Sequence, residues 1–521
     1  MEQPDAQHPT PSSEAPSANT NASSARADGH YRSPTSGPRR PNFRTYGVPV
    51  RQRRQRAYAA QHAAQHAAHA PGAGVSAPRR MLATAFINRN FALLWWGQTV
   101  SSIGDFAWDT ALVLWIATDI AGNQSWAPLA VSGAILAAAI PQIVIGPVAG
   151  VFVDRWDKRQ TMIVMTAIQA VLAALLVVPV LGVSLPDIGS AHIAPGWLLG
   201  VIYADIFLLT SCSQFFLPAQ LALIKDIVAE RHQDQAIEMT QAIQGLAVVI
   251  GPPVAAALVF GLGIEWALLL NAITFGLCFW ATVAIKAPPS VSSLAPGEAG
   301  HFSREFAAGI RYVLGHNVLR TVLIAEILTW LGFGALQSLG YFFITENLHA
   351  PPETYGWFGA IFGFGAVTGA AFVTVFGRRI GLVRVLWVSL VTSGIFVATM
   401  AHLTSFGLAM LAAFLFGVTA TAILISAGPL AIDATEKAFV GRVTAVINPV
   451  GRLAAFFSVI IAGSLVATVL SGLHVTILGV EFNGVNVVFS LMGLLAVAGG
   501  IYTRVHLRAA MDVGRQHRRA A

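Results

Sequence analysis

Charged residues are scarce in this chain: only 11% of its 521 residues are Asp, Glu, Lys or Arg, whereas 55% are hydrophobic. A soluble globular domain has about 25% charged residues, so that class is excluded for most of the chain. None of the four lysines follows a glycine as in a P-loop, and the apolar runs contain no HExxH or GxSxG motif. The sequence therefore predicts a membrane protein that is not an enzyme, does not hydrolyse nucleotides and needs no metal or other cofactor.

Cysteine is also rare. Cys212 and Cys278 both lie inside apolar runs, where we expect small buried hydrophobic residues and no disulfide framework. The net charge of +7 is not accompanied by a basic patch interleaved with aromatic residues on a soluble domain. Nucleic acid is therefore not an expected partner, and the positive charge is better explained by the orientation of a membrane protein.

Apolar residues are too few to form a core in the first 80 residues, which consist mainly of Ala, Ser, Pro, Gln and His with arginines clustered between Arg51 and Arg56. No apolar stretch follows those arginines, so the segment is not a secretory signal peptide. We expect residues 1–85 to form a disordered basic cytosolic tail that contacts anionic lipid. Met81 follows Arg79 and Arg80 and opens the apolar part of the chain, which suggests the hypothesis that translation begins there.

Apolar windows of about 20 residues recur from Phe91 onward, separated by short polar breaks. They predict twelve membrane-spanning helices, at residues 91–118, 126–151, 161–184, 197–218, 238–261, 265–285, 319–344, 354–376, 382–403, 406–431, 443–470 and 485–504.

A polar cytosolic linker, 286–318, divides the spans six and six, and its stretch FSREFAAGIRYVLG predicts an amphipathic helix. When the first predicted span is aligned with the seventh at one constant offset, Gln98 matches Glu326 and Asp109 matches Gln337. Such matches are expected if the two halves arose by duplication. We expect an all-α integral membrane protein of two pseudo-symmetric six-helix bundles. Its predicted domains are the two bundles, 86–285 and 319–506, and a basic cytosolic tail, 507–521.

Charge differs between the two alternating sets of loops. One set holds the basic residues, including Lys158, Lys225 and Arg442, and the positive-inside rule places it in the cytosol. The sequence therefore predicts a multi-pass monomer of the cell membrane with both termini in the cytosol. The other set has no Lys or Arg but contains Asp119, Asp187, Glu265, Glu346, Glu353 and Glu481.

The segment GVFVDRWDKR, residues 150–159, lies between the second and third predicted spans. Gly150 would let a neighbouring helix approach the end of the second span, and Asp154 would meet the positive N-terminus of another helix. Arg155 and Arg159 would pair with acids across the loop. These roles predict a conformational latch; the alternative is a solvated basic loop that only orients the protein.

This segment resembles the signature loop of the major facilitator superfamily, GxxxDRxGRR in outline. It departs from that pattern at Asp157, where the family has a second glycine, and at Lys158, where it has an arginine. The resemblance implies two six-helix bundles that face one another across a central cavity. It also implies that Asp154 holds the second helix against the start of the eleventh, near Arg442, in the outward-open state.

Several segments are similar to the drug and siderophore exporter branch of that superfamily, which includes macrolide-efflux-like and enterobactin-exporter-like proteins. They are FFLPAQLALIKDIV, FAAGIRYVLGHNVLR, the GPP at 251–253 and the turn at 441–443. The resemblance implies export of bulky hydrophobic or amphiphilic compounds, generally in exchange for protons. Gly251 and Pro252 match the helix-five antiporter motif, although its usual final glycines are absent. Ordinary helix packing is the alternative role for these two residues.

Four carboxylates lie well inside predicted spans, a depth at which charged groups rarely face lipid. Asp105 and Asp109 lie one helical turn apart, so their mutual repulsion favours the sharing of one proton, and we predict that they carry the transported proton. In the alternative, Asp109 is simply solvated near the outer surface. Asp205 and Glu326 are each expected to be a partner for a substrate cation, a second proton site or a structurally paired acid.

Arg452 is the basic residue whose position relative to the membrane the sequence leaves open. If the eleventh helix starts near Val443, Arg452 lies within the membrane, where it pairs with a buried acid or binds an anionic substrate. If the span starts at Arg452 itself, residues 437–450 form an interfacial helix.

The leading functional hypothesis is a secondary active transporter that exports a hydrophobic or amphiphilic small molecule, drug-like or siderophore-like, by proton antiport with alternating access. Its expected partners are that small molecule, protons and membrane lipid. A facilitator or importer without proton coupling on the same fold is the first alternative. An intramembrane enzyme or a receptor is the second.

Overall fold

The computed structural model describes residues 87–122, 124–184, 195–286, 302–436, 439–473, 475–477 and 480–520, all within a single unit, Ser76–Ala521. Twelve helices among these residues are long and apolar enough to span a membrane, which confirms the predicted number. The tail expected at 1–85 lies outside the described residues, as do Asp187 and Lys437.

The first six spans contain nearly all of the described residues before the linker. They comprise α3 (Arg89–Trp115) with the π-helical turn η1 (Ile116–Ile120), α4 (Ala127–Val144) with α5 (Gly146–Val153), α6 (Lys158–Ser184), α7 (Pro195–Ile227), η2 (Glu230–His232) with α8 (Gln233–Gly261), and α9 (Ile264–Ala284).

Local chemistry explains two features of these helices. Asn88 caps α3, because its side chain accepts a hydrogen bond of 2.8 Å from the backbone N–H of Phe91. The second span is divided at Ile145, between α4 and α5, where Gly146 is followed by Pro147. Proline has no N–H to donate, so the regular hydrogen-bond ladder is interrupted there.

The second six spans follow the linker helix α10 (Phe302–Gly315). They comprise α11 (Asn317–Phe342) with η3 (Phe343–Asn347), α12 (Thr354–Ile380), α13 (Leu382–Met400), α14 (Phe406–Asp433), α15 (Val440–Ser464) with η4 (Leu465–Val469), and α16 (Gly484–Ala520).

The linker helix α10 packs on the first turns of α15. A Cβ added to Gly309 would lie 2.8 Å from the carbonyl oxygen of Arg442, and the ring of Tyr312 stacks on that of Phe439 with centroids 4.5 Å apart. This amphipathic segment is therefore partnered by protein, because its small and aromatic residues meet the start of the eleventh span.

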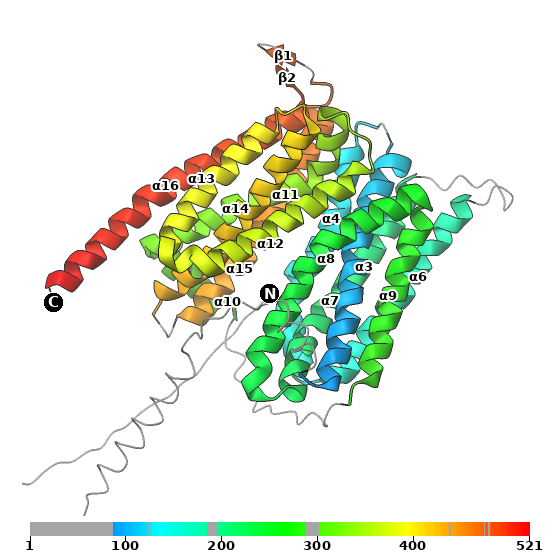
Figure 1. Cartoon of the computed structure of the whole chain (residues 1–521), viewed down its shortest axis with the longest axis horizontal. Coiled ribbons are helices and arrows are strands. Elements are labelled where there is room, and N and C mark those ends of the chain that lie inside the picture. The colour runs from blue at the N-terminus through cyan, green and yellow to red at the C-terminus, as the bar shows by residue number, and fades with distance from the viewer. Residues whose placement is uncertain are drawn as a thin grey trace, which may run out of the picture. The chain divides into compact units, whose positions relative to one another are not determined.

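The apolar part of α16, Gly484–Leu507, agrees with the span predicted at 485–504, and the helix itself continues through Ala520. One feature differs from the sequence prediction. An antiparallel hairpin of β1 (Val475–Ile477) and β2 (Val480–Phe482) occupies a predicted loop, where β-branched and aromatic residues favour strand pairing. Figure 1 shows this hairpin at the opposite end of the helices from α10.

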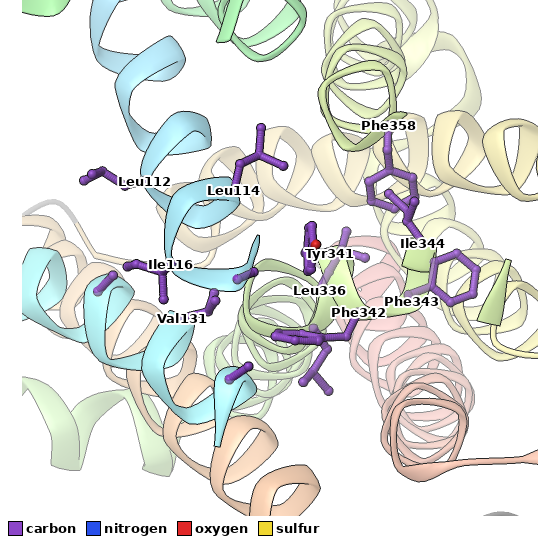
Figure 2. Packing of buried hydrophobic residues seen from close by; sticks show 14 of the residues in the cluster. Leu112, Leu114, Ile116, Val131, Leu336, Tyr341, Phe342, Phe343, Ile344 and Phe358 are labelled. Atoms are coloured by element: carbon purple, nitrogen blue, oxygen red, sulfur yellow. The ribbon is translucent and has the colours of Figure 1, made fainter. Parts of the chain in front are cut away.

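One hydrophobic core joins the two bundles at the end that carries the hairpin. It contains Val131 of α4 together with Leu336 of α11 and Phe358 of α12. Figure 2 shows these side chains gathered with others from both bundles, among them Leu114 and Tyr341. This end of the protein is closed by packed side chains.

At the end that carries the linker, each bundle has a hydrophobic core of its own. Phe91, Met162 and Leu223 belong to the core of the first bundle, whereas Leu319 and Val443 belong to that of the second. The described residues thus form one shared core at the hairpin end and two separate cores at the linker end, so the two bundles part toward the linker.

Candidate functional site

A cavity of about 150 Å³ lies inside the first bundle, among α3, α6, α7, α8 and α9. This volume holds a few water molecules but is smaller than the roughly 300–1,000 Å³ of pockets that enclose drug-sized ligands. No group of three or more His, Cys, Asp or Glu side chains that could hold a metal occurs in the described part of the chain. Most residues lining the cavity are polar: Gln98, Ser101, Asp105, Thr166, Gln169, Ser213 and Gln244, with Phe216, Leu217, Phe275 and Cys278.

Hydrogen bonds between side-chain amides and hydroxyls join the helices around this cavity. Gln98 and Gln244 both donate to the hydroxyl of Ser102, at 3.2 and 3.3 Å, and Gln169 donates to the hydroxyl of Ser213 at 2.9 Å. The Gln98 amide oxygen is buried and accepts no hydrogen bond from the described residues. It is therefore available to a water molecule in the cavity.

Among the described residues that line this cavity, Asp105 is the one with a carboxylate. Two other helices pack closely against its turn of α3. A Cβ at Gly104 would overlap the side chain of Thr274 on α9, and one at Gly251 on α8 would lie 2.9 Å from the backbone nitrogen of Ala107. Both neighbouring helices approach α3 because a glycine faces the contact.

The two acids of α3 are placed differently. Asp105 is half-buried beside the cavity, whereas Asp109, one turn later, has an accessible side chain. Neither acid has an ion-pair partner among the described residues.

The other two intramembrane acids lie apart from this pair. Asp205 on α7 is only 7% exposed and does not line the cavity, and its Oδ2 has no hydrogen-bond partner among the described residues. Glu326 on α11 is 8% exposed and accepts a hydrogen bond of 3.1 Å from the indole N–H of Trp330. The structure brings two of the four predicted acids together and separates the others.

The structure corrects the expected contacts of the 150–159 segment. Nothing lies within 4 Å of a Cβ added to Gly150, so no helix approaches there. Asp154 and Arg155 are exposed, and neither forms an ion pair with a described residue. Arg159 donates to the backbone carbonyl of Val283 at 2.6 Å instead of pairing with an acid. These contacts are missing because the bundles share no core at the linker end.

Different residues of the same segment make contacts that the sequence did not predict. Lys158 forms a salt bridge of 2.8 Å with Asp226 at the end of α7. The side chain of Asp157 accepts a hydrogen bond of 2.7 Å from the backbone N–H of Gln160, as an N-cap does. Asp157 stands where the superfamily pattern has a glycine, and this cap gives it a structural role.

Arg442 and Asp154 are not in contact. Arg442 lies in the first turn of α15, with its guanidinium 5.3 Å from the centroid of the Phe439 ring. The predicted latch between these residues concerns the outward-open state, and in this structure both members are free to form it.

The helix-five motif faces the second bundle as well as α3. A Cβ at Gly356 of α12 would lie 2.6 Å from the carbonyl oxygen of Pro252, and one at Gly363 would lie 3.1 Å from that of Val248. Pro252 has no N–H to donate to the Val248 carbonyl four residues earlier, which leaves this oxygen to face α12. Gly251 and Pro252 therefore lie at contacts both within the first bundle and between the bundles.

Gly251→Ala is expected to destabilise the protein by about 1–3 kcal/mol, because the new methyl group would press on the α3 backbone beside Asp105. Gly276→Ala in α9 is the matched control, since nothing lies within 4 Å of a Cβ there. Thermal unfolding of the two detergent-purified variants measures the difference. Equal melting temperatures would contradict the close contact between α8 and α3.

Sequence analysis missed the cavity residues Gln169, Ser213 and Gln244, although amides inside apolar spans are a usable signal. It also missed the hydrogen bond of 2.6 Å between the hydroxyls of Ser132 and Ser338, which joins α4 to α11. Nothing in the sequence indicates which serines of separate spans meet.

The sequence and this architecture can be compared with those of known proteins. The family model described as transmembrane secretion effector matches residues 82–510, and its family is a branch of the major facilitator superfamily. The chain belongs to the major facilitator superfamily. This confirms the resemblance of the 150–159 segment and identifies the protein as a membrane transporter.

Relatives of this major facilitator protein include the uncharacterized MFS-type transporter YfiS of Bacillus subtilis (strain 168), which is 25% identical over 415 residues, 78% of this chain and 91% of YfiS. Macrolide efflux protein A of Streptococcus pyogenes is 24% identical over 312 residues, 58% of this chain and 73% of its own length. The first is a transporter by description, and the second is an efflux protein.

Solved structures show the same fold. The nucleoside transporter NupG has a TM-score of 0.61 and 12% identity, with 80% of this chain and 99% of that chain covered. A bacterial homologue of the iron transporter ferroportin, in an inward-facing state, has a TM-score of 0.57 and 15% identity, with 80% and 97% covered. At these identities the likeness concerns the arrangement of the helices alone.

Proposed function

We propose that this major facilitator protein exports a hydrophobic or amphiphilic small molecule in exchange for protons, by alternating access of a site between its two bundles. The observation that carries the proposal is Asp105, a carboxylate near the middle of a span that lines a polar cavity and has no ion-pair partner among the described residues. The relation to macrolide efflux protein A supports the outward direction and the chemical class of cargo.

Proton coupling follows from the cost of an isolated charge in a membrane span. Asp105 sits beside a cavity of water-molecule size, and Asp109 follows it one turn closer to the shared core. When the surroundings close, the pair gains from binding a proton, and when water enters, the proton is released. Movement of the bundles thereby becomes linked to proton transfer.

Alternating access is supported by the arrangement of the hydrophobic cores. The shared core closes the hairpin end, whereas separate cores leave the bundles unjoined at the linker end. Transport needs the converse state, in which the linker end closes around Asp154 and Arg442 and the hairpin end opens. The structure thus corresponds to the state that receives cargo from the linker side.

A transport assay separates export by antiport from facilitated diffusion. Inverted membrane vesicles are given an imposed pH gradient, acidic inside, and uptake of fluorescent amphiphiles is followed, with one anionic and one cationic compound tested in parallel. We expect gradient-dependent accumulation that collapses when the gradient is dissipated. Equilibration at the same rate with and without the gradient would show a facilitator.

We also propose the orientation predicted from loop charge, with the linker in the cytosol of the cell and the hairpin outside. A cysteine at Glu353 should react with a membrane-impermeant maleimide in intact cells, whereas one at Lys158 should not. Because Cys212 and Cys278 are both buried in spans, their replacement by alanine gives a suitable background. The reverse labelling pattern would overturn the orientation.

A further inference from the structure

Arg452 lies deep within a candidate span. α15 begins at Val440, twelve residues earlier, so Arg452 lies about 18 Å along the helix axis. The candidate span Val440–Val469 is 30 residues long, so Arg452 lies near the middle of this helix. We therefore take the eleventh span to start near Val443, the first of the two interpretations of the sequence. Every other lysine or arginine in the described spans lies near a span end.

The only partner that the structure gives this cation is neutral. Its Nη1 donates a hydrogen bond of 3.2 Å to the amide oxygen of Gln142 on α4, across the boundary between the bundles. No carboxylate among the described residues forms an ion pair with it, and its side chain is exposed. An arginine at this depth is costly unless an anion compensates its charge, and guanidinium groups suit carboxylates through paired hydrogen bonds.

An aromatic surface lies beside Arg452. The adjacent Gly451 has no side chain, and a Cβ there would lie 2.6 Å from the Trp330 ring of α11, so this indole packs directly on α15. Glu326 holds the indole through its N–H, and Phe333 meets the ring edge-on at 5.8 Å. A cation on α15 and a group of aromatic rings at the adjacent residue of that helix suit a ligand with an acidic group on an apolar body.

We infer that Arg452 binds an acidic group of the cargo, which makes the transported compound an amphiphilic anion, with Trp330 contacting its apolar part. Gln142 then accepts a hydrogen bond from the guanidinium while cargo is absent, and the acidic group of the cargo replaces Gln142 when the cargo binds. The inference rests on the proposed function only in taking the bound anion to be the cargo.

The test uses two probes that differ by one charge, pyrenebutyrate and the neutral pyrenebutanol, with binding followed by tryptophan quenching of purified protein in phosphatidylcholine nanodiscs. We expect the wild type to bind pyrenebutyrate more tightly. Arg452→Gln should weaken pyrenebutyrate binding about ten-fold or more and leave pyrenebutanol binding unchanged, since hydrogen bonds to charged groups account for effects of this size. Arg452→Lys should fall between them because it keeps charge but not the planar fork.

Arg384→Gln is the matched control, an exposed arginine at the start of α13 that should leave both probes unaffected. Gln142→Ala should retain pyrenebutyrate binding, since the inference needs only the cation. Three results would overturn the inference: equal wild-type affinity for the two probes, unchanged pyrenebutyrate binding in Arg452→Gln, or equal weakening of both probes, which indicates a structural role.

A lipid headgroup is the other source of an acidic group. If Arg452→Gln changes pyrenebutyrate binding only in nanodiscs that contain phosphatidylglycerol, the anion at this position is lipid and the assignment to cargo is wrong. Since binding is measured without a pH gradient, failure of proton coupling and failure of anion binding are distinguishable.

Discussion

Replacing Asp105 and Asp109 together with Asn is expected to abolish gradient-driven accumulation of cargo. One pH unit corresponds to about 1.4 kcal/mol and supports about ten-fold accumulation per proton exchanged, and the double variant should fall to simple equilibration. Binding and downhill exchange should survive, because Asn preserves the shape of the cavity while removing the group that takes up the proton. The measurement is uptake of the fluorescent amphiphile into inverted vesicles with an imposed pH gradient.

Single substitutions assign the dominant acid. We expect Asp105→Asn to have the larger effect, since Asp105 lines the polar cavity and lies on the turn clamped by α8 and α9, whereas Asp109 is exposed. Asp119→Asn is the matched control on the same span, at its far end, where Asp119 accepts a hydrogen bond from Thr118. A double variant that still concentrates cargo in response to the gradient would move the coupling site to Asp205 or Glu326.

Asp154→Asn is expected to lower the transport rate about ten-fold or more while leaving the amount of protein in the membrane unchanged. In the structure Asp154 is exposed and has no ion-pair partner among the described residues, so its loss should not destabilise this state. In the converse state it would meet the N-terminus of α15 near Arg442. A charge-assisted contact of about 1.5–3 kcal/mol lost from one state alone shifts the equilibrium between states by that factor.

Asp226→Asn is the control for Asp154→Asn. It removes the partner of Lys158 on the same side of the protein, and a solvent-accessible salt bridge of this kind contributes about 0–1 kcal/mol. Exchanging the charges, Asp154→Arg with Arg442→Asp, should restore part of the transport lost in Asp154→Asn. Wild-type transport by Asp154→Asn would remove the latch from the mechanism.

The sequence predicted local features of single helices better than contacts between helices. The sequence predicted Asp105 as an acid well inside a span, and the structure places it near the middle of the first span beside a polar cavity. The sequence predicted that Glu326 and Asp205 do not face lipid, and both are buried. No sequence pattern indicated whether they lie close to the acid pair of α3. Distances between spans depend on how each helix is rotated against its neighbours, which hydropathy does not encode.

The contacts of the 150–159 segment show the same limit. The family resemblance indicated Asp154 and Arg442 as potential partners, yet the bundles share a hydrophobic core only at the hairpin end, and these residues do not meet. The alternating access that we propose requires two packings of one sequence whose free energies are similar. A sequence motif can therefore contain residues that make contacts in only one of the two states.

The sequence by itself determined the twelve spans, the intramembrane acids and the superfamily, because the thickness of a bilayer and the cost of buried charge act on each helix separately. Only the tertiary structure decided which end of the bundles is closed, that Gln169 and Gln244 share a cavity with Asp105, and that Arg452 faces Gln142 instead of an acid. These features arise from contacts between helices far apart in the chain, and such contacts are fixed by side-chain packing across the whole bundle.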